Sequence, residues 1–194
     1  MGNTILLLLL LVIFNCTVVG VSVGMAMIPI AFTVVSLSTF SLDDAAKWDT
    51  YVLTAPGTKR RVVLAKYCST FLMTIMGAAL SVIIALVALL IRHETWSSEI
   101  TFSFLASIGI TLCLNAFLLP LVYRFGTDRA RIFLMLLIFI PIGVVVLLKT
   151  SFPTLPFFNE NALLYVLLSL PLVGIFLSAL SYFISRAIYA RKEF

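Results

Sequence analysis

The run "YCSTFLMTIMGAALSVIIALVALLI", residues 67–91, decides the fold class of this chain. It contains no Asp, Glu, Lys or Arg. A helix crosses the roughly 30 Å hydrocarbon core of a bilayer with about 20 apolar residues, so this run is long enough to span it. The whole chain agrees, since 62% of its 194 residues are hydrophobic and 11% are charged, whereas soluble domains carry about 25% charged residues. The sequence predicts an all-α, polytopic membrane protein.

Other apolar runs of similar length predict about six transmembrane helices, which form a single transmembrane domain over residues 1–194. The run from Ile5 to Leu42 is too long for one span, and Gly20 and Gly24 mark the expected reversal within it. The expected spans are 4–22, 25–42, 67–91, 100–123, 131–149 and 162–185. The segment 43–66, between the second and third spans, carries much of the charge of the chain.

The basic residues predict how the spans are oriented. Six spans place both termini on one side of the membrane, and eleven Lys and Arg then fall on that side: Lys47, Lys59, Arg60, Arg61, Lys66, Arg124, Arg129, Arg131, Arg186, Arg191 and Lys192. The other side receives only Arg92 and Lys149. Because cytoplasmic loops are enriched in Lys and Arg, the N- and C-termini are expected to be cytoplasmic. Such residues commonly meet anionic lipid, so we expect membrane lipid and no nucleic acid as a partner.

The segment 43–66 is expected to hold a short amphipathic cytoplasmic helix. Ser41 and Asp44 have the spacing of a capping box, which would start the helix at this point. Apolar residues then recur at helical spacing, at Ala45, Trp48, Val52 and Ala55. Pro56 would end this helix, and a second helix begins near Thr58 and continues into the third span.

Three consecutive bases, Lys59, Arg60 and Arg61, open that second helix. Positive charges at a helix N-terminus oppose the helix dipole, so helix stability does not explain them. Two explanations stay open: membrane orientation with binding to acidic lipid, or contact with the acidic surface of a protein partner. Trp48 and Tyr51 have the same two explanations, because they would lie in the membrane interface or fill a groove on a partner.

The sequence shows no motif for catalysis. His93 is its one histidine, the three cysteines are far apart, and no phosphate-binding loop or nucleophile motif occurs. We therefore expect a non-catalytic chain without a metal or cofactor of its own. The centres of the spans hold no charged residue, which argues against a proton-coupled carrier. Asn115 has two open interpretations, a hydrogen bond between helices or a place in a substrate pathway.

Two stretches resemble a known family. The run "LTAPGTKRRVVLAKY", residues 53–67, preceded by Asp43, Asp44 and Trp48, resembles the segment that follows the second span in bacterial ABC-2 type transporter permease subunits. That family pattern reads "W…L..P.(S/T)(K/R)(K/R).(I/V)V..KY". The run "PLVYRFGTDRAR", residues 120–131, resembles the second cytoplasmic loop of the same family. With six short spans and small outer loops, the resemblance covers nearly the whole chain.

The resemblance implies a transmembrane permease subunit of an ATP-driven exporter in the bacterial cytoplasmic membrane. Two identical or homologous subunits would pair, and each would dock on a separate cytosolic ABC ATPase, whose dimer binds ATP and Mg. The residues that map onto the ATPase-coupling segment are Asp43, Asp44, Lys47, Trp48, Tyr51, Pro56, Lys59, Arg60, Arg61 and Lys66. Those that map onto the second cytoplasmic loop are Arg124, Gly126, Arg129 and Arg131.

Subunits of this kind export hydrophobic or amphipathic molecules, such as peptides, antibiotics or lipids, and the resemblance implies a substrate of that class. The composition of the chain is equally compatible with an alternative function. A non-transporting immunity or regulatory protein that binds a partner in the bilayer would also be small, apolar and positively charged on one side.

Overall fold

The computed structural model describes residues 20–48, 58–151 and 160–190. They form five α-helices: α2 (Val21–Ala45), α4 (Thr58–Arg92), α5 (Ser98–Phe125), α6 (Thr127–Ser151) and α7 (Glu160–Ala190). Four of them, α2, α4, α5 and α7, contain stretches that are long and apolar enough to cross a membrane. The prediction of an all-α, polytopic membrane protein is therefore confirmed. The predicted first span, 4–22, lies almost wholly outside the described residues.

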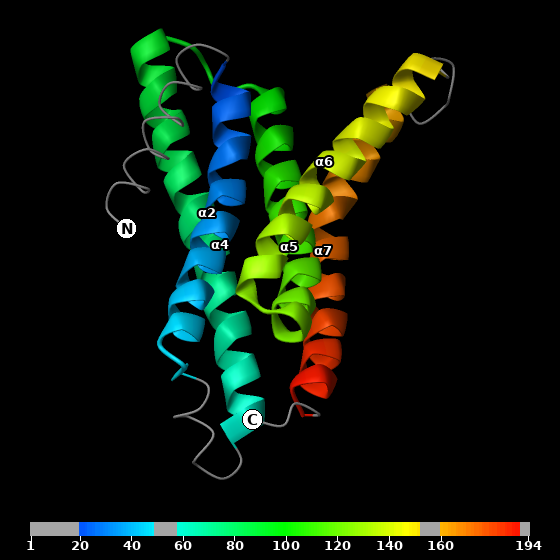
Figure 1. Ribbon diagram of the computed structural model, residues 1–194. Coiled ribbons are helices and arrows are strands. Elements are labelled where there is room, and N and C mark those ends of the chain that lie inside the picture. Colours follow the sequence, from blue (N-terminus) through cyan, green and yellow to red (C-terminus); the bar gives the residue numbers. More distant parts are fainter. Residues whose placement is uncertain (1–19, 49–57, 152–159, 191–194) are drawn as a thin grey trace.

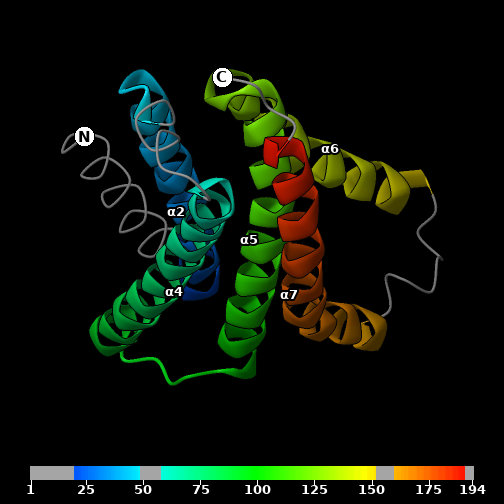
Figure 2. The same ribbon diagram turned by 90° about the horizontal axis from the view of Figure 1, so that it is seen from below.

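The helices run alternately up and down, with α5 in the middle of the bundle (Figure 1). Seen along the bundle, α2 and α4 lie on one side of α5, and α6 and α7 lie on the other (Figure 2). The predicted spans 67–91, 100–123, 131–149 and 162–185 fall within α4, α5, α6 and α7 respectively. Since α5 contacts each of the other four helices, it is the axis of the fold.

Helix α4 is longer than a bilayer crossing requires. Its 35 residues rise by about 52 Å at 1.5 Å per residue, against roughly 30 Å of hydrocarbon. It begins at Thr58, as the sequence predicts, and its first turns extend beyond the neighbouring helices at one end of the bundle (Figure 1). This end carries Arg60 and Arg61, both on the exposed surface.

The contact between α5 and α7 depends on two glycines. A Cβ atom at Gly109 would lie 2.5 Å from the Leu170 Cβ and 2.7 Å from the α7 backbone. A Cβ atom at Gly174 would lie 2.7 Å from the Leu112 Cβ and 3.2 Å from the Gly109 carbonyl oxygen. Helices in membranes associate through close packing of small residues, and these two glycines permit such an approach.

The end of α2 corrects one prediction. Ser41 does not cap a new helix, because α2 continues without a break through Asp43, Asp44 and Ala45. The helix ends at Ala45, the Ala46 N–H donates to the Leu42 carbonyl at 2.9 Å, and Lys47 follows with a left-handed φ of 51°. The local capping pattern was outweighed by the apolar face of α2, which continues to Phe40, and by a contact of Asp44 that is given below. The predicted helix after Trp48 lies outside the described residues.

The expected reversal at Gly20 and Gly24 is also corrected. Gly20 precedes α2 with a φ of 140°, but Gly24 lies inside the first turns of the helix, where its N–H donates to the Gly20 carbonyl. The second span therefore starts near Val21 rather than at residue 25. Val21 and Met25 are buried against Ala85 and neighbouring residues of α4, and this packing holds the first turn in helical form.

Large apolar side chains cover the outer faces of α4, α6 and α7. Examples more than half exposed are Leu72, Ile83, Leu90, Met135, Phe139, Leu172 and Phe176. In water such faces would be a liability, but in a bilayer they contact lipid tails or other membrane helices. The fold thus has a hydrocarbon-facing exterior and a core centred on α5.

We predict that Gly109→Ala destabilises the protein in detergent by about 1–3 kcal/mol, because the added methyl group overpacks the contact between α5 and α7. Gly143→Ala in α6 is the matched control, since no atom lies within 4 Å of its Cβ position. That change is expected to be neutral or to stabilise by up to about 1 kcal/mol. Equal unfolding free energies for the two variants would contradict the proposed close contact.

Candidate functional site: the charged end of the bundle

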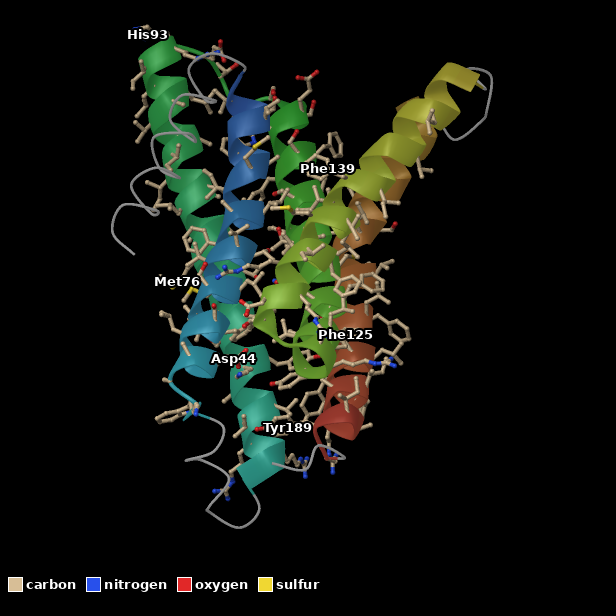
Figure 3. All side chains as sticks on the ribbon, in the orientation of Figure 1. Asp44, Met76, His93, Phe125, Phe139 and Tyr189 are labelled. Atoms are coloured by element: carbon tan, nitrogen blue, oxygen red, sulfur yellow. The ribbon has the colours of Figure 1, made fainter. Side chains whose placement is uncertain are left out.

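Most of the described basic residues lie near one end of the bundle. This end is formed by the C-termini of α2, α5 and α7 and by the N-termini of α4 and α6 (Figure 1). The labelled Asp44, Phe125 and Tyr189 lie toward it, whereas His93 lies at the opposite end (Figure 3). The described basic residues near it are Lys47, Arg60, Arg61, Lys66, Arg124, Arg129, Arg131 and Arg186. Arg92, at the other end of α4, is close to His93 in the chain.

The turn between α5 and α6 presents the predicted second loop. Gly126 alone separates the two helices and has a φ of 82°, a left-handed value that glycine adopts without strain. Its N–H donates to the Val122 carbonyl at 2.9 Å, and its carbonyl accepts from the Ala130 N–H at 3.1 Å. The exposed side chains of Arg124, Arg129 and Arg131 are therefore carried on a tight, hydrogen-bonded turn.

The two predicted loops meet at Asp44 and Thr127. The Thr127 hydroxyl donates to the Asp44 carboxylate, with 2.8 Å between Oγ1 and Oδ2. Thr127 is the first residue of α6 and is buried, so the carboxylate lies at the positive end of the α6 dipole. This contact compensates for placing two acids, Asp43 and Asp44, in the last turn of α2, where the dipole disfavours them.

Next to this contact lies a cluster to which all five described helices contribute. Its buried members are Leu37, Phe40, Val62, Val63, Leu118, Leu119, Val122, Tyr123, Ala130, Leu134 and Tyr189. Tyr123 of α5 and Tyr189 of α7 meet edge to face, with ring centroids 5.3 Å apart. We call this set the basal cluster. It joins the ends of the helices that carry the predicted loops into one packed unit.

A hydrogen-bonded chain connects α4, α7 and α5 next to the basal cluster. The Ser181 hydroxyl donates to the Ala116 carbonyl, so its oxygen accepts from the Tyr67 hydroxyl at 2.6 Å. Ser185 lies 2.8 Å from the same tyrosine oxygen. The Tyr67 ring also contacts Tyr182 edge to face at 5.5 Å. Tyr67, the last residue of the run that resembles the family, thus binds the long helix α4 to α7.

Several predicted coupling residues surround a cavity of about 480 Å³ between α2 and α4. Asp43, Trp48, Arg61 and Lys66 all line it. Trp48 is 53% exposed, whereas Lys66 is only 8% exposed. Arg60 is exposed beside the cavity-lining Arg61. Of the remaining predicted coupling residues, Tyr51 and Pro56 and the side chain of Lys59 lie outside the described part of the chain.

Asn115 faces a second cavity, of about 310 Å³, between α4, α5 and α7. Its amide nitrogen donates to the Thr74 hydroxyl of α4 at 3.1 Å, which agrees with the predicted bond between helices. Its carbonyl oxygen is buried and has no hydrogen-bond partner within the described residues. The lining is otherwise largely apolar and includes Leu64, Phe71 and Leu112. The second interpretation of Asn115, a place in a substrate pathway, therefore stays open.

A comparison with protein families gives a match over residues 1–190 to a family described as ABC-2 family transporter protein. The chain belongs to the ABC-2 transporter family. The resemblance that residues 53–67 and 120–131 carry is thereby confirmed, and it extends across nearly all 194 residues. Comparisons with curated proteins and with solved structures gave no match.

Membership in this family identifies the chain as a multi-pass ABC-2 membrane protein. Such a component is typically the non-catalytic permease of its transporter. The geometry of this ABC-2 chain agrees with that class in its apolar exterior and multiple spans. At the charged end, the bond between Asp44 and Thr127 joins the start of the segment 43–66 to the run 120–131, which resembles the second cytoplasmic loop of ABC-2 permeases.

Sequence reasoning missed several residues that organise this end of the ABC-2 chain. Thr127 is the first residue of α6, directly after the Gly126 N-cap, and no local signal identifies it as the partner of Asp44. Phe40 and Tyr123, which enclose Lys66, carried no such signal, because buried aromatic residues are common in every span. Nor did the sequence indicate that Lys66 would be buried rather than exposed beside Arg61.

The Asp44–Thr127 bond is testable by a double-mutant cycle with Asp44→Ala and Thr127→Val. Because hydrogen bonds to charged groups contribute more than neutral ones, we expect a coupling free energy of about 1 kcal/mol in detergent unfolding measurements. Thr127→Ser is the control that keeps the hydroxyl group and should keep most of this coupling. A coupling free energy near zero would show that the two loops are not held together by this contact.

Proposed function

We propose that this chain is the permease subunit of an ATP-driven ABC-2 exporter and that the charged end is where a separate cytosolic ATPase docks. The basal cluster is the observation that carries the proposal. A docking surface can drive a membrane domain only if the surface and the spans move together. Here the ends of α2, α4, α5, α6 and α7 share one packed cluster next to the charged residues.

The contacts support a specific route for the motion. Trp48 is an exposed aromatic residue at the charged end. It follows Asp44, which binds Thr127, by four residues in the chain. Arg60 and Arg61 lie in the first turn of α4, whose next residues, Val62 and Val63, belong to the basal cluster. A partner that displaces this segment would therefore displace α4 directly and, through Tyr67, α7 as well.

The orientation follows from the distribution of charge. The end rich in Lys and Arg is assigned to the cytoplasmic side, in accordance with the positive-inside rule. This is the side on which ATP and an ATPase are available. The opposite end of α4, with Arg92 and His93, is assigned to the outer side of the bacterial cytoplasmic membrane.

A second permease subunit, identical or homologous, is expected to complete the pathway. The outer face of α4 carries Leu64, Phe71 and other exposed apolar side chains, and it borders the cavity that Asn115 lines. A largely apolar cavity suits an amphipathic substrate, such as a peptide, antibiotic or lipid, when its lining includes a polar atom like the Asn115 amide oxygen, which has no partner among the described residues. Asn115 is proposed to contact the polar part of that substrate.

The alternative of a non-transporting immunity or regulatory protein needs no coupling between the charged end and the spans. We favour the exporter because the Asp44–Thr127 bond and the basal cluster tie both loop-bearing ends to the spans. Under the alternative, changes at the charged end would leave any ATPase unaffected.

The test is the ATPase activity of the native complex after Trp48→Ala or Arg60→Glu. Loss of the exposed aromatic contact or reversal of the charge is expected to release the ATPase or to lower its substrate-stimulated rate at least several-fold. Trp96→Ala is the matched control, because Trp96 is 43% exposed but lies at the opposite end of the bundle. Thermal unfolding should show that all three variants remain folded.

The proposal fails if no ATPase co-purifies with the wild-type chain, or if Trp48→Ala and Trp96→Ala affect hydrolysis equally. Retention of wild-type coupling by both Trp48→Ala and Arg60→Glu would favour the non-transporting alternative.

A further inference from the structure

Lys66 is a buried cation at the charged end of the bundle. Its residue is 8% exposed, and its ammonium group lies 5.3 Å from the centre of the Phe40 ring and 5.8 Å from that of the Tyr123 ring. These rings belong to α2 and α5, so the lysine of α4 is held between three helices. The position of the charge is therefore fixed by the packing of the bundle.

This charge lacks a counter-ion in the described part of the chain, where no carboxylate forms an ion pair with Lys66. Removing an ammonium group from water is unfavourable unless it is paired or coordinated. Two aromatic faces compensate in part, through cation–π attraction. The N–H donors of the ammonium group stay available to an anion, because a ring face attracts the cation but does not accept a conventional hydrogen bond.

Lys66 lines the cavity of about 480 Å³ between α2 and α4, together with a second cation, Arg61. Thr39, Ser69 and Trp48 also line it. Asp43 contributes the one carboxylate of the described lining, so two cations and one anion give the cavity a net positive charge. A cavity of this volume and net positive charge suits a phosphate group that is esterified to a small alcohol.

The same face of α4 becomes apolar toward the middle of the bundle. Ala65 and Ser69 line the cavity, and Leu72 and Met76 follow on that face at helical spacing. Leu72 is 59% exposed and Met76 is 53% exposed, and Met76 lies between the levels of Asp44 and His93 (Figure 3). An acyl chain that began at the cavity would therefore have an apolar surface to follow.

From these contacts we propose that the cavity is a binding site for an anionic phospholipid of the cytoplasmic leaflet. Its phosphate is bound by Lys66 and Arg61, and an acyl chain lies along Leu72 and Met76. Basic pockets between transmembrane helices on the cytoplasmic side suit such headgroups. Asp43, Trp48, Arg61 and Lys66 of the lining belong to the segment assigned to the ATPase, so the lipid joins α2 to α4 at that surface. The site does not depend on the proposed transport function, since its ligand is a membrane component.

Asp43 affects which headgroup charge the site prefers. Its carboxylate lowers the net charge of the lining, so a headgroup with one net negative charge is favoured over one with several. A zwitterionic headgroup has the same phosphate but carries its own ammonium group, which Lys66 and Arg61 would repel. Asp43→Asn is therefore expected to strengthen binding of the anionic lipid.

The experiment measures the thermal unfolding midpoint of the purified full-length chain in detergent, titrated with phosphatidylglycerol or with phosphatidylcholine. Wild-type protein is expected to show a larger upward shift with phosphatidylglycerol. Lys66→Met, which keeps an apolar stem between the two rings, should lose most of this difference. Arg61→Gln, at an exposed position, should lose part of it, and Asp43→Asn should increase it.

Arg186→Gln is the matched control, because it removes one exposed charge from the same end of the bundle but does not line the cavity. It should keep the wild-type shift. The proposal is overturned if Arg61→Gln and Lys66→Met respond to phosphatidylglycerol as the wild type does, or if Arg186→Gln loses as much as they do. An equal shift with inorganic phosphate at matched concentration would also overturn it, since the ligand would then be a free anion rather than a lipid.

Discussion

Packing around Tyr123 is the interaction on which the rest of this structure depends. The ring lies on α5, the axis of the bundle, and contacts Tyr189 of α7 and the Lys66 ammonium group of α4. Every described helix contributes to the surrounding basal cluster. Because protein interiors are close-packed, a displacement of one helix end in this cluster is transmitted to the others rather than absorbed. A charged surface on such a base is suited to receive mechanical work from a partner.

Toward the opposite end the bundle is less uniformly joined. Helices α5 and α7 stay close because Gly109 and Gly174 allow their backbones to approach. Beyond these close contacts, α6 leans away from α5, and the first turns of α7 lean in the same direction (Figure 1). Because the helices are packed at the basal cluster and separate farther from it, small motions at the cluster can become larger motions along the spans. The cavity beside Asn115 lies between three of these helices, α4, α5 and α7.

The parts of the fold that could be predicted from the sequence are those that depend on local physical chemistry. The absence of charge over residues 67–91 identifies a span, and the clustering of Arg and Lys identifies one end of the bundle. Asp44 shows the limit. Its spacing from Ser41 satisfies a capping rule, yet its partner is Thr127, 83 residues away, and no local pattern reveals such a contact. The burial of Lys66 likewise depends on rings from two other helices.

The charged end is proposed as the surface that an ATPase contacts. The most direct test of this proposal is site-specific photo-crosslinking in native membranes, with a photoreactive residue at position 48 or at position 96. Both positions hold exposed tryptophans, at opposite ends of the bundle. We expect a chain with ATP-binding motifs, identified by mass spectrometry, to be crosslinked from position 48 and not from position 96. Crosslinking of that chain from position 96 alone, or of no ATPase from either position, would contradict it.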